Sequence, residues 1–261
     1  MRPLGDLRGA DRVTGVFFDI DDTLTTDGAL TAQAYAAMER LKISGRRVVP
    51  ITGRPAGWCD HIARMWPVDA VVGENGAFYF WHDRDAHRLR RRYLMNEAAR
   101  AANRARLDAI AHRVIASVPG CALASDQNYR ECDLAIDFCE DVPALPLETA
   151  ERIAGLLRAE GMTAKISSIH VNAWFGGYDK LGMTKLLAQE RFGVELDAAR
   201  SEFVFVGDSP NDAPMFGYFP RSVGVANIAR FAGHLEAAPA YVTRGAGGAG
   251  FAELARHLLG E

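Results

Sequence analysis

Two carboxylates, Asp19 and Asp21, stand two residues apart in Asp19-Ile20-Asp21-Asp22-Thr23, directly after the apolar run 16–18. In an extended chain, residues i and i+2 face the same side, so both acids can converge on one reacting centre. Two acids this close repel each other, and a bound divalent cation with oxygen ligands would offset their charge. The spacing therefore predicts a metal site, and the alternative is an Asp-rich turn that caps the next segment.

Three further segments carry groups suited to phosphate chemistry. Residues 46–51 predict a strand that runs into Thr52-Gly53-Arg54-Pro55, where a hydroxyl and backbone N–H groups can hold a phosphate oxygen. Lys180 precedes a predicted helix much later in the chain. The apolar strand 203–206 then ends in Gly207-Asp208-Ser209-Pro210-Asn211-Asp212, a second carboxylate cluster. Open α/β sheets place their active sites at such carboxyl ends of strands.

The motifs Asp-x-Asp-x-Thr, Thr-Gly-Arg, Lys and Gly-Asp-x-x-Asn-Asp, in this order, resemble those of the haloacid dehalogenase-like hydrolase superfamily. The resemblance covers residues 13 to about 80 and about 175 to 250, and the chain departs from it where Leu181 follows Lys180 in place of Gly. It implies an α/β fold with a Rossmann-like parallel sheet and helices on both faces. It also implies that Asp19 attacks phosphorus to form an aspartyl-phosphate, with Asp21 as general acid and base.

The same resemblance implies Mg²⁺ as the cofactor. The ion would be held by the Asp19 carboxylate, the Asp21 backbone carbonyl and the Asp208 carboxylate. Thr52 would donate to a phosphoryl oxygen, and Lys180 would neutralise charge between the nucleophile and the phosphate.

Residues beside the motifs are further candidates for orienting water or substrate. Asn211 or Asp212 would position metal-bound water or the lysine, and the alternative for Asp212 is a cap on the next turn. Gly53, Arg54 and Asn75, the last in the sequence Gly-Glu-Asn-Gly-Ala, either reach the substrate or shape their loops.

The elements between the motifs must bring the strand ends together. A helix from Thr31 to Gly45, with Tyr35, Met38 and Leu41 on one face, supplies the crossover after the first strand. The glycine-rich segment 245–250 satisfies G-x-G-x-x-G, but too little chain follows it for a dinucleotide site, so it predicts a tight strand-to-helix loop.

The stretch between Gly53 and Lys180 is longer than one more core strand needs, which predicts an inserted domain. We expect a catalytic core at 1–81 and 174–261 and an α+β cap at 82–173. The insert contains helical patterns at 97–117 and 147–160, an alternating strand at 133–138 and a returning strand at 164–171. A cap of this size after the second motif resembles subclass IIB, which includes sugar-phosphate phosphatases and the eukaryotic-type phosphomannomutases.

Such a cap would close over the active site, exclude water and recognise the leaving group. The candidates are Asn128, Arg130 and Glu131 before the alternating strand, and His170, Asn172 and Trp174 on the returning strand. Arginine suits a second anionic group, and Trp174 suits the apolar face of a sugar ring. The alternative for each is a surface or packing role.

Composition argues against several other classes of partner. A net charge of −3 gives no general attraction to nucleic acid or anionic membranes. The first 12 residues contain no apolar signal-peptide core, and no apolar stretch is long enough to span a bilayer. The basic run 87–92 could bind phosphate-rich partners, but its alternation with Leu and Tyr favours a solvated strand face. The four cysteines lack metal-site spacing, so we expect buried thiols in a reducing, cytoplasmic setting.

Taken together, these patterns favour a Mg²⁺-dependent phosphomonoesterase for a small phosphorylated metabolite, most simply a sugar phosphate. A phosphohexomutase would return the phosphoryl group to a reoriented sugar and is the alternative among enzymes. A catalytically silent sensor of a phosphorylated ligand is the alternative outside enzymes, although it would have no use for the second acid at Asp21.

Overall fold

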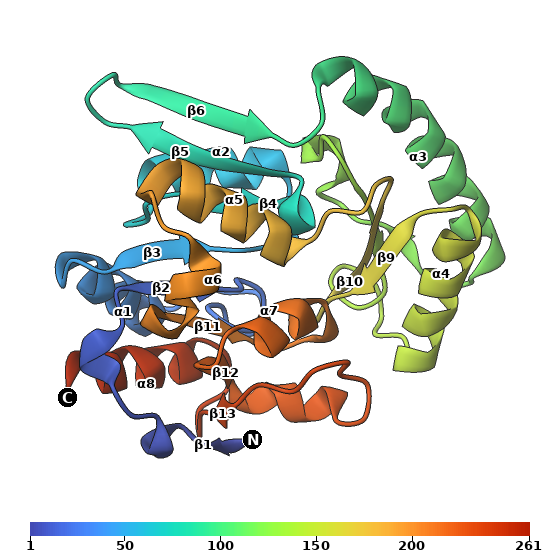
Figure 1. Cartoon of the computed structure of the whole chain (residues 1–261). Helices are drawn as coiled ribbons and strands as arrows, with labels where there is room; N and C mark the ends of the chain where they lie inside the picture. The colour runs from blue at the N-terminus through green and yellow to red at the C-terminus, as the bar shows by residue number, and fades with distance from the viewer.

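The computed structural model describes all of residues 1–261, and its largest sheet is wholly parallel (Figure 1). Its six strands lie in the order β1 (Arg2–Pro3), β13 (Tyr241–Val242), β12 (Ser222–Gly224), β11 (Phe203–Gly207), β2 (Gly15–Phe18) and β3 (Arg47–Pro50). The predicted Rossmann-like parallel core is confirmed. Because β11, β2 and β3 are neighbours, the motifs that follow them meet at one edge of the sheet.

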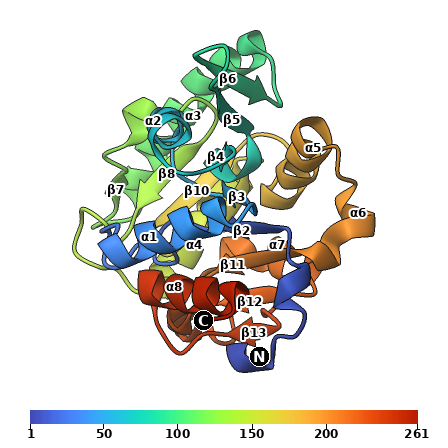
Figure 2. The ribbon, with the colours of Figure 1, turned by 90° about the vertical axis from the view of Figure 1, so that its left-hand side faces the viewer.

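Helices cover both faces of this sheet (Figure 2). One face carries α1 (Ala32–Ile43), α2 (Ala56–Met65) and α8 (Gly247–Leu259), and the other carries α5 (Lys180–Phe192), α6 (Leu196–Ala199) and α7 (Ala213–Tyr218). Alternation along β2 explains the two layers, since Val16 and Phe18 pack into the first apolar cluster and Phe17 into the second. Thr31 caps α1 as predicted, accepting a hydrogen bond from the N–H of Ala34.

A small antiparallel sheet extends the core beyond β3. It consists of β4 (Val71–Gly73), β5 (Phe78–Asp83) and β6 (Arg88–Tyr93), and a parallel bridge between Ile51 and Val72 joins it to the main sheet. The predicted domain boundary at residue 82 falls inside β5, so we propose that the insert begins only after β6. The basic run forms β6, where Arg88 and Arg91 are exposed.

The insert folds around a four-stranded antiparallel sheet of its own. Its strands lie in the order β7 (Ala122–Leu123), β8 (Leu134–Asp137), β10 (His170–Trp174) and β9 (Thr163–Ile166). The helices α3 (Glu97–Ser117) and α4 (Leu147–Ala159) match the predicted helices and share a separate buried apolar cluster with this sheet. We call residues 94–177 the cap, and Figure 1 shows it to one side of the core.

One local prediction from the sequence is corrected by the structure, and another is confirmed. The single returning strand predicted at 164–171 is instead the hairpin β9–β10, because Ser167 and His170 exchange backbone and side-chain hydrogen bonds that turn the chain. The glycine-rich segment 245–250 joins β13 to α8, as predicted for a strand-to-helix loop. None of the helices combines the length and apolar character that crossing a membrane requires.

Candidate active site

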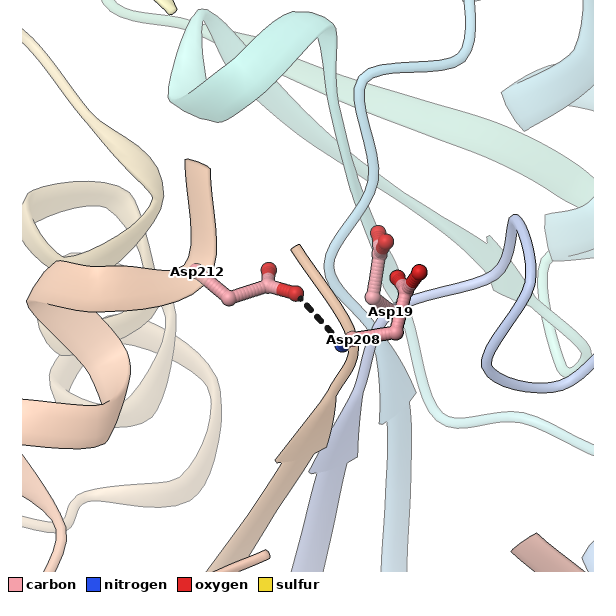
Figure 3. A group of neighbouring side chains, drawn as sticks. All are labelled: Asp19, Asp208 and Asp212. Carbon is pink, nitrogen blue, oxygen red and sulfur yellow. Dashed lines mark hydrogen bonds between the residues drawn. The ribbon is translucent and has the colours of Figure 1, made fainter. Parts of the chain in front are cut away.

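Asp19, Thr52 and Asp208 each follow the last residues of a core strand, namely β2, β3 and β11. The ligand atoms of Asp19, Asp208 and Asp212 all lie within 4.8 Å of one another (Figure 3). Figure 3 shows the Asp19 and Asp208 carboxylates side by side, with Asp212 approaching them from the turn that precedes α7. The parallel order of the strands therefore converts two distant sequence motifs into one carboxylate cluster.

Lys180, the first residue of α5, is the cation at the centre of this cluster. Its Nζ donates to Asp19 Oδ1 at 3.0 Å and to Asp212 Oδ1 at 2.7 Å, and its side chain is only 1% exposed. Asp179 holds the start of the helix in place by accepting from the N–H of Gly182. Burial would lower the pKa of Lys180, but the charges of Asp19 and Asp212 outweigh burial and raise it, so the ammonium stays charged.

The Asp208 carboxylate and the second oxygen of Asp212 also accept hydrogen bonds. Asp212 Oδ2 accepts from the N–H groups of Asp208 at 3.0 Å and Ser209 at 3.4 Å. Asp208 accepts from Thr23 Oγ1 at 3.2 Å and from Asn227 Nδ2 at 3.1 Å. Asp212 thus shapes the loop that carries Asp208 and also anchors the lysine, which unites the two roles weighed for it from the sequence.

The charge balance of the cluster fits a bound divalent cation. Burial raises the pKa of Asp19 to about 8 against the opposing effect of Lys180, and burial together with Asp19 and Asp212 raises the pKa of Asp208 well above its usual range. A buried set of three carboxylates with one ammonium carries uncompensated negative charge when ionised. A hard cation that prefers carboxylate oxygen would relieve this repulsion, so the donor set suits Mg²⁺.

Asp21 is held by a two-pronged ion pair with Arg54. The guanidinium Nε donates to Asp21 Oδ1 at 2.9 Å, and Nη2 donates to the same oxygen at 2.8 Å. Arg54 is itself buried, with a side chain 5% exposed, so this pairing is well shielded from water. The Thr-Gly-Arg motif therefore contributes an orienting group for the second acid, rather than only a loop.

The same arginine reaches into the cap. Its Nη2 donates to Glu140 at 2.5 Å and its Nη1 to Asp126 at 3.3 Å. Glu140 also lies 2.9 Å from Nε2 of His170. Burial would raise the pKa of Glu140, but hydrogen bonds from His170 and Arg54 outweigh it and lower the pKa to about 2. A chain of charged groups thus runs from the second acid of the core to the cap.

Arg130 seals another part of the core–cap contact. Its side chain is fully buried and donates to Asp126, to Asp133 and, at 2.8 Å, to the backbone carbonyl of Gly53. All the guanidinium nitrogens therefore have partners within the protein. Four of its five N–H groups have partners within the protein, and the expectation that Arg130 meets a second anionic group of the substrate stays a prediction.

A group of small polar side chains surrounds Gly53. Asn211 Nδ2 donates to Asn75 Oδ1 at 3.3 Å, and Asn172 Nδ2 donates to Asp133 Oδ2 at 3.2 Å. A Cβ atom at Gly53 would lie 3.1 Å from Asn75 Nδ2 and 3.3 Å from Asn172 Oδ1, so glycine allows this close approach. The amide Nδ2 of Asn75 is buried without a hydrogen-bond partner and is available to a ligand oxygen.

Thr52 lies at the base of the same region and is fully buried. Its Oγ1 accepts from the backbone N–H of Arg54 at 3.0 Å, which leaves its hydroxyl hydrogen free to donate. This geometry agrees with the donor role expected for the residue at the end of β3.

Several predicted cap residues lie away from the site. Glu131 projects towards Arg100, 3.6 Å away, and Asn128 lines an outer groove. Trp174 is buried, donates from Nε1 to the carbonyl of Tyr178 at 3.1 Å and stacks on that ring. The idea that Trp174 faces a sugar ring is therefore wrong, because both its ring and its N–H are used in packing.

Glu74 forms a contact between core and cap that the sequence did not predict. Its buried carboxylate accepts from the N–H of Ala56 in the core and from the three consecutive N–H groups of residues 131–133 in the cap. It therefore joins core and cap through a carboxylate in a nest of backbone donors. A lone acidic residue before Asn75 gave no local signal of this role.

Two neighbouring spaces lie between core and cap. The enclosed one, of only about 10 Å³, is lined by Asp19, Asp21, Gly53, Arg54 and Asn211 from the core, and by Arg130, Ser167, Ile169, His170 and Asn172 from the cap. A larger cleft of about 440 Å³ shares Asp21, Arg54 and Ile169 with it and leads outwards. The enclosed space admits no more than about one water, so the cap is closed over the carboxylates.

One protein-family model matches part of the sequence of this chain. A model of the haloacid dehalogenase-like hydrolase family matches residues 16–113, a segment that contains Asp19, Asp21 and Thr52. No curated protein matches the chain.

Solved structures resemble nearly the whole chain. Protein 0175 of Thermoplasma acidophilum has a TM-score of 0.68 at 18% identity, covering 95% of this chain and 98% of that one. The C-terminal domain of trehalose-6-phosphate phosphatase from C. albicans has a TM-score of 0.68 at 14% identity, with coverage of 96% and 94%. The subclass IIB sugar phosphatase BT4131 has a TM-score of 0.61 at 15% identity, with coverage of 94% and 98%. The likeness at these identities is one of fold.

Proposed function

We propose that the chain is a haloacid dehalogenase-like hydrolase, as the family model matched to residues 16–113 supports, and that it acts as a Mg²⁺-dependent phosphatase of small sugar phosphates or related metabolites. One arrangement supports the proposal above the others: Asp19 lies 3.0 Å from the buried ammonium of Lys180 and beside the Asp208 carboxylate. Asp21, two residues further on, is oriented separately by Arg54. A nucleophile, an acid and positive charge are the groups that phosphoryl transfer needs.

In the proposed reaction, a carboxylate oxygen of Asp19 attacks phosphorus and the bond from phosphorus to the alcohol oxygen breaks. Asp21 gives its proton to the departing oxygen. Asp21 then takes a proton from the water that attacks the aspartyl-phosphate. Cleavage of the bond between phosphorus and Asp19 releases inorganic phosphate and restores both acids, so atoms and protons balance.

Other residues of the chain would bind and orient the phosphoryl group. Lys180 is placed to neutralise charge between Asp19 and the phosphate, and its second bond to Asp212 fixes its position. Thr52 and the unpartnered Nδ2 of Asn75 offer donors to phosphoryl oxygens. The backbone at Gly53 lets these groups approach closely. Preorganised donors of this kind typically contribute about 2.7–4 kcal/mol each to lowering a barrier.

The residues that would hold Mg²⁺ are Asp19 and Asp208, with the backbone carbonyl of Asp21 as a third oxygen. When bound, the ion would stabilise negative charge on the transferring phosphoryl group. Asp212 is engaged by Lys180 and by backbone N–H groups, so we assign it to positioning these partners.

The cap would exclude water and recognise the alcohol part of the substrate. His170 and Asn172 line the enclosed space from the cap side, close to Gly53 and Asp21. The proposed setting is the cytoplasm, where the four free cysteines would remain reduced.

The test is phosphate release from a panel of sugar phosphates, including trehalose 6-phosphate, with Mg²⁺ and with chelator. We expect metal-dependent release by the wild type and none by Asp19→Asn. Asp197→Asn, which removes an exposed carboxylate paired with Lys185, is the matched control and should retain full activity. Conversion of a sugar 1-phosphate to its 6-phosphate without phosphate release would indicate a mutase. No reaction of any ester with the folded protein would refute the proposal.

A further inference from the structure

The outer cleft beside the proposed acid carries an excess of carboxylates. It lies between the loop after β2 and the cap segments around Cys139 and Ser168, and its volume of about 440 Å³ suits a small ligand. Its charged lining residues are four acids, Asp21, Asp22, Asp27 and Glu140, and two bases, Arg54 and Arg230. Since the enclosed space adjoins Asp19, the alcohol part of a phosphate ester would extend past Asp21 into this cleft.

Both bases of the cleft are paired with carboxylates of the protein. Arg54 is paired with Asp21 and Glu140, as described above. Arg230 donates to Asp22 Oδ2 at 2.9 Å and lies 3.6 Å from Asp208. An anionic substituent that approached Arg230 would therefore also lie near the Asp22 carboxylate and be repelled by it. Arg130, on the enclosed side, is equally occupied.

The acids, in contrast, are not fully balanced. Asp27 is exposed at the rim and takes part in no ion pair. The hydrogen bonds from His170 and Arg54 that lower the pKa of Glu140 keep this residue ionised throughout the neutral range. Four acids against two bases leave the cleft negative near neutral pH.

The neutral groups of the cleft are suited to hydroxyls. Thr25 and Ser168 line it, and the hydroxyl of Ser168 is buried without a hydrogen-bond partner. A hydroxyl can both donate and accept, so Ser168 can form a hydrogen bond with a substrate hydroxyl that acts as either donor or acceptor. A carboxylate or second phosphate in the same place would find acceptors with the same charge.

We propose that this cleft selects phosphate monoesters whose alcohol part is neutral or carries an ammonium group, and that it rejects those with a second anion. This inference rests on the proposed phosphatase function and specifies its substrate class. The discrimination acts through Asp22, Asp27 and Glu140, which repel a second anion, while Arg54 and Arg230 are held by their own carboxylates.

Matched pairs of esters test the proposal. Glycerol 3-phosphate differs from 3-phosphoglycerate in a hydroxymethyl group replaced by carboxylate. Glucose 6-phosphate and glucosamine 6-phosphate can likewise be compared with 6-phosphogluconate. We expect kcat/KM to be at least about tenfold lower for the anionic member of each pair, and the amino sugar to match or exceed the neutral sugar.

Charge-removing variants locate the effect. Asp27→Asn should raise kcat/KM for the anionic esters more than for the neutral ones, and Asp22→Asn should do so further by releasing Arg230. Asp85→Asn, in the distant exposed turn between β5 and β6, removes the same charge and should leave the ratio of kcat/KM for anionic esters to kcat/KM for neutral esters unchanged. The ratio thus distinguishes a local charge effect from a change in net charge.

The outcomes separate the two proposals. Equal or faster hydrolysis of the anionic esters, or a shift in the ratio no larger in Asp27→Asn and Asp22→Asn than in Asp85→Asn, would overturn the charge selection alone. Absence of hydrolysis for every ester would overturn the phosphatase function and the selection with it.

Discussion

Replacing Lys180 by methionine should destabilise the protein strongly while keeping most of the side-chain volume. The ammonium is the only cation that donates to Asp19 and Asp212, at 3.0 and 2.7 Å, and it is 1% exposed. Its loss would leave buried carboxylates without their partner. Removing one member of a buried ion pair costs about 3–5 kcal/mol, largely because the remaining charge stays buried. We expect a loss of this size in the free energy of unfolding.

Lys185→Met provides the matched control. Lys185 lies on the same helix, and its Nζ donates to Asp197 at 2.7 Å, but both side chains are exposed. Exposed pairs contribute about 0–1 kcal/mol, so this variant should unfold almost like the wild type. The helix and the substitution are shared, and the two lysines differ in burial and in the number of carboxylates that each one neutralises.

Urea unfolding of the metal-free proteins measures the difference, and phosphate release measures the effect on catalysis. We expect Lys180→Met to lose at least about 100-fold in kcat, since a single preorganised donor can contribute this much. Lys180→Met/Asp212→Asn should recover part of the lost stability, because it removes one of the carboxylates that Lys180 had neutralised. Stability of Lys180→Met within 1 kcal/mol of Lys185→Met would refute the view that this lysine offsets the buried acids.

Three further predictions follow from other contacts. Gly76→Ala should lower the free energy of unfolding by about 2–5 kcal/mol, because Gly76 has φ +106° and a Cβ would lie 2.0 Å from the carbonyl oxygen of Asp179. Gly45→Ala is the control for thermal unfolding. Gly45 has φ +85° with open space around it, so this variant should lose only about 1–2 kcal/mol. Glu140 has a pKa lowered from 4.5 to about 2, so its stabilising contribution is complete above pH 4.5 and disappears as the pH falls towards 2. The free energy of unfolding of Glu140→Gln should therefore depend less on acid pH than that of the wild type. Equal dependence in the two proteins would contradict the pairing of Glu140. Mg²⁺ at about 100 times its Kd should stabilise the wild type by about 2.7 kcal/mol and chelator should reverse this, whereas Asp208→Asn should respond far less in the same titration.

Local patterns predicted the core and the position of its carboxylates well. Apolar runs followed by Asp19 and Asp208 place acids at strand ends, and adjacent parallel strands bring those ends together. The helix Glu97–Ser117 was equally predictable from the sequence, because its Ala-rich sequence contains no glycine or proline. These features depend on periodicity and on a general property of open sheets, both of which a single sequence contains.

The domain boundary predicted at residue 82 divides the hairpin β5–β6, which we instead place with the core, and the difference has a physical reason. A strand pattern does not specify its partner, and β5 pairs with β4 of the core rather than with the sheet of the insert. Phe78 and Phe80 complete the core cluster that also contains Phe18. Only the location of their apolar neighbours, which are distant in sequence, shows where the hairpin belongs.

The contacts between core and cap were beyond prediction because each joins a charged side chain to a partner that is remote in sequence. Arg54 meets Glu140, and Glu74 meets the backbone of residues 131–133. Neither acid differs locally from the rest of the 33 Asp and Glu residues of the chain. What distinguishes them is burial against a specific donor, and burial of a charge is tolerated only when the whole fold provides that donor. The catalytic motifs therefore identify the chemistry, whereas the charges that position the second acid and select the leaving group become visible only once both domains are in place.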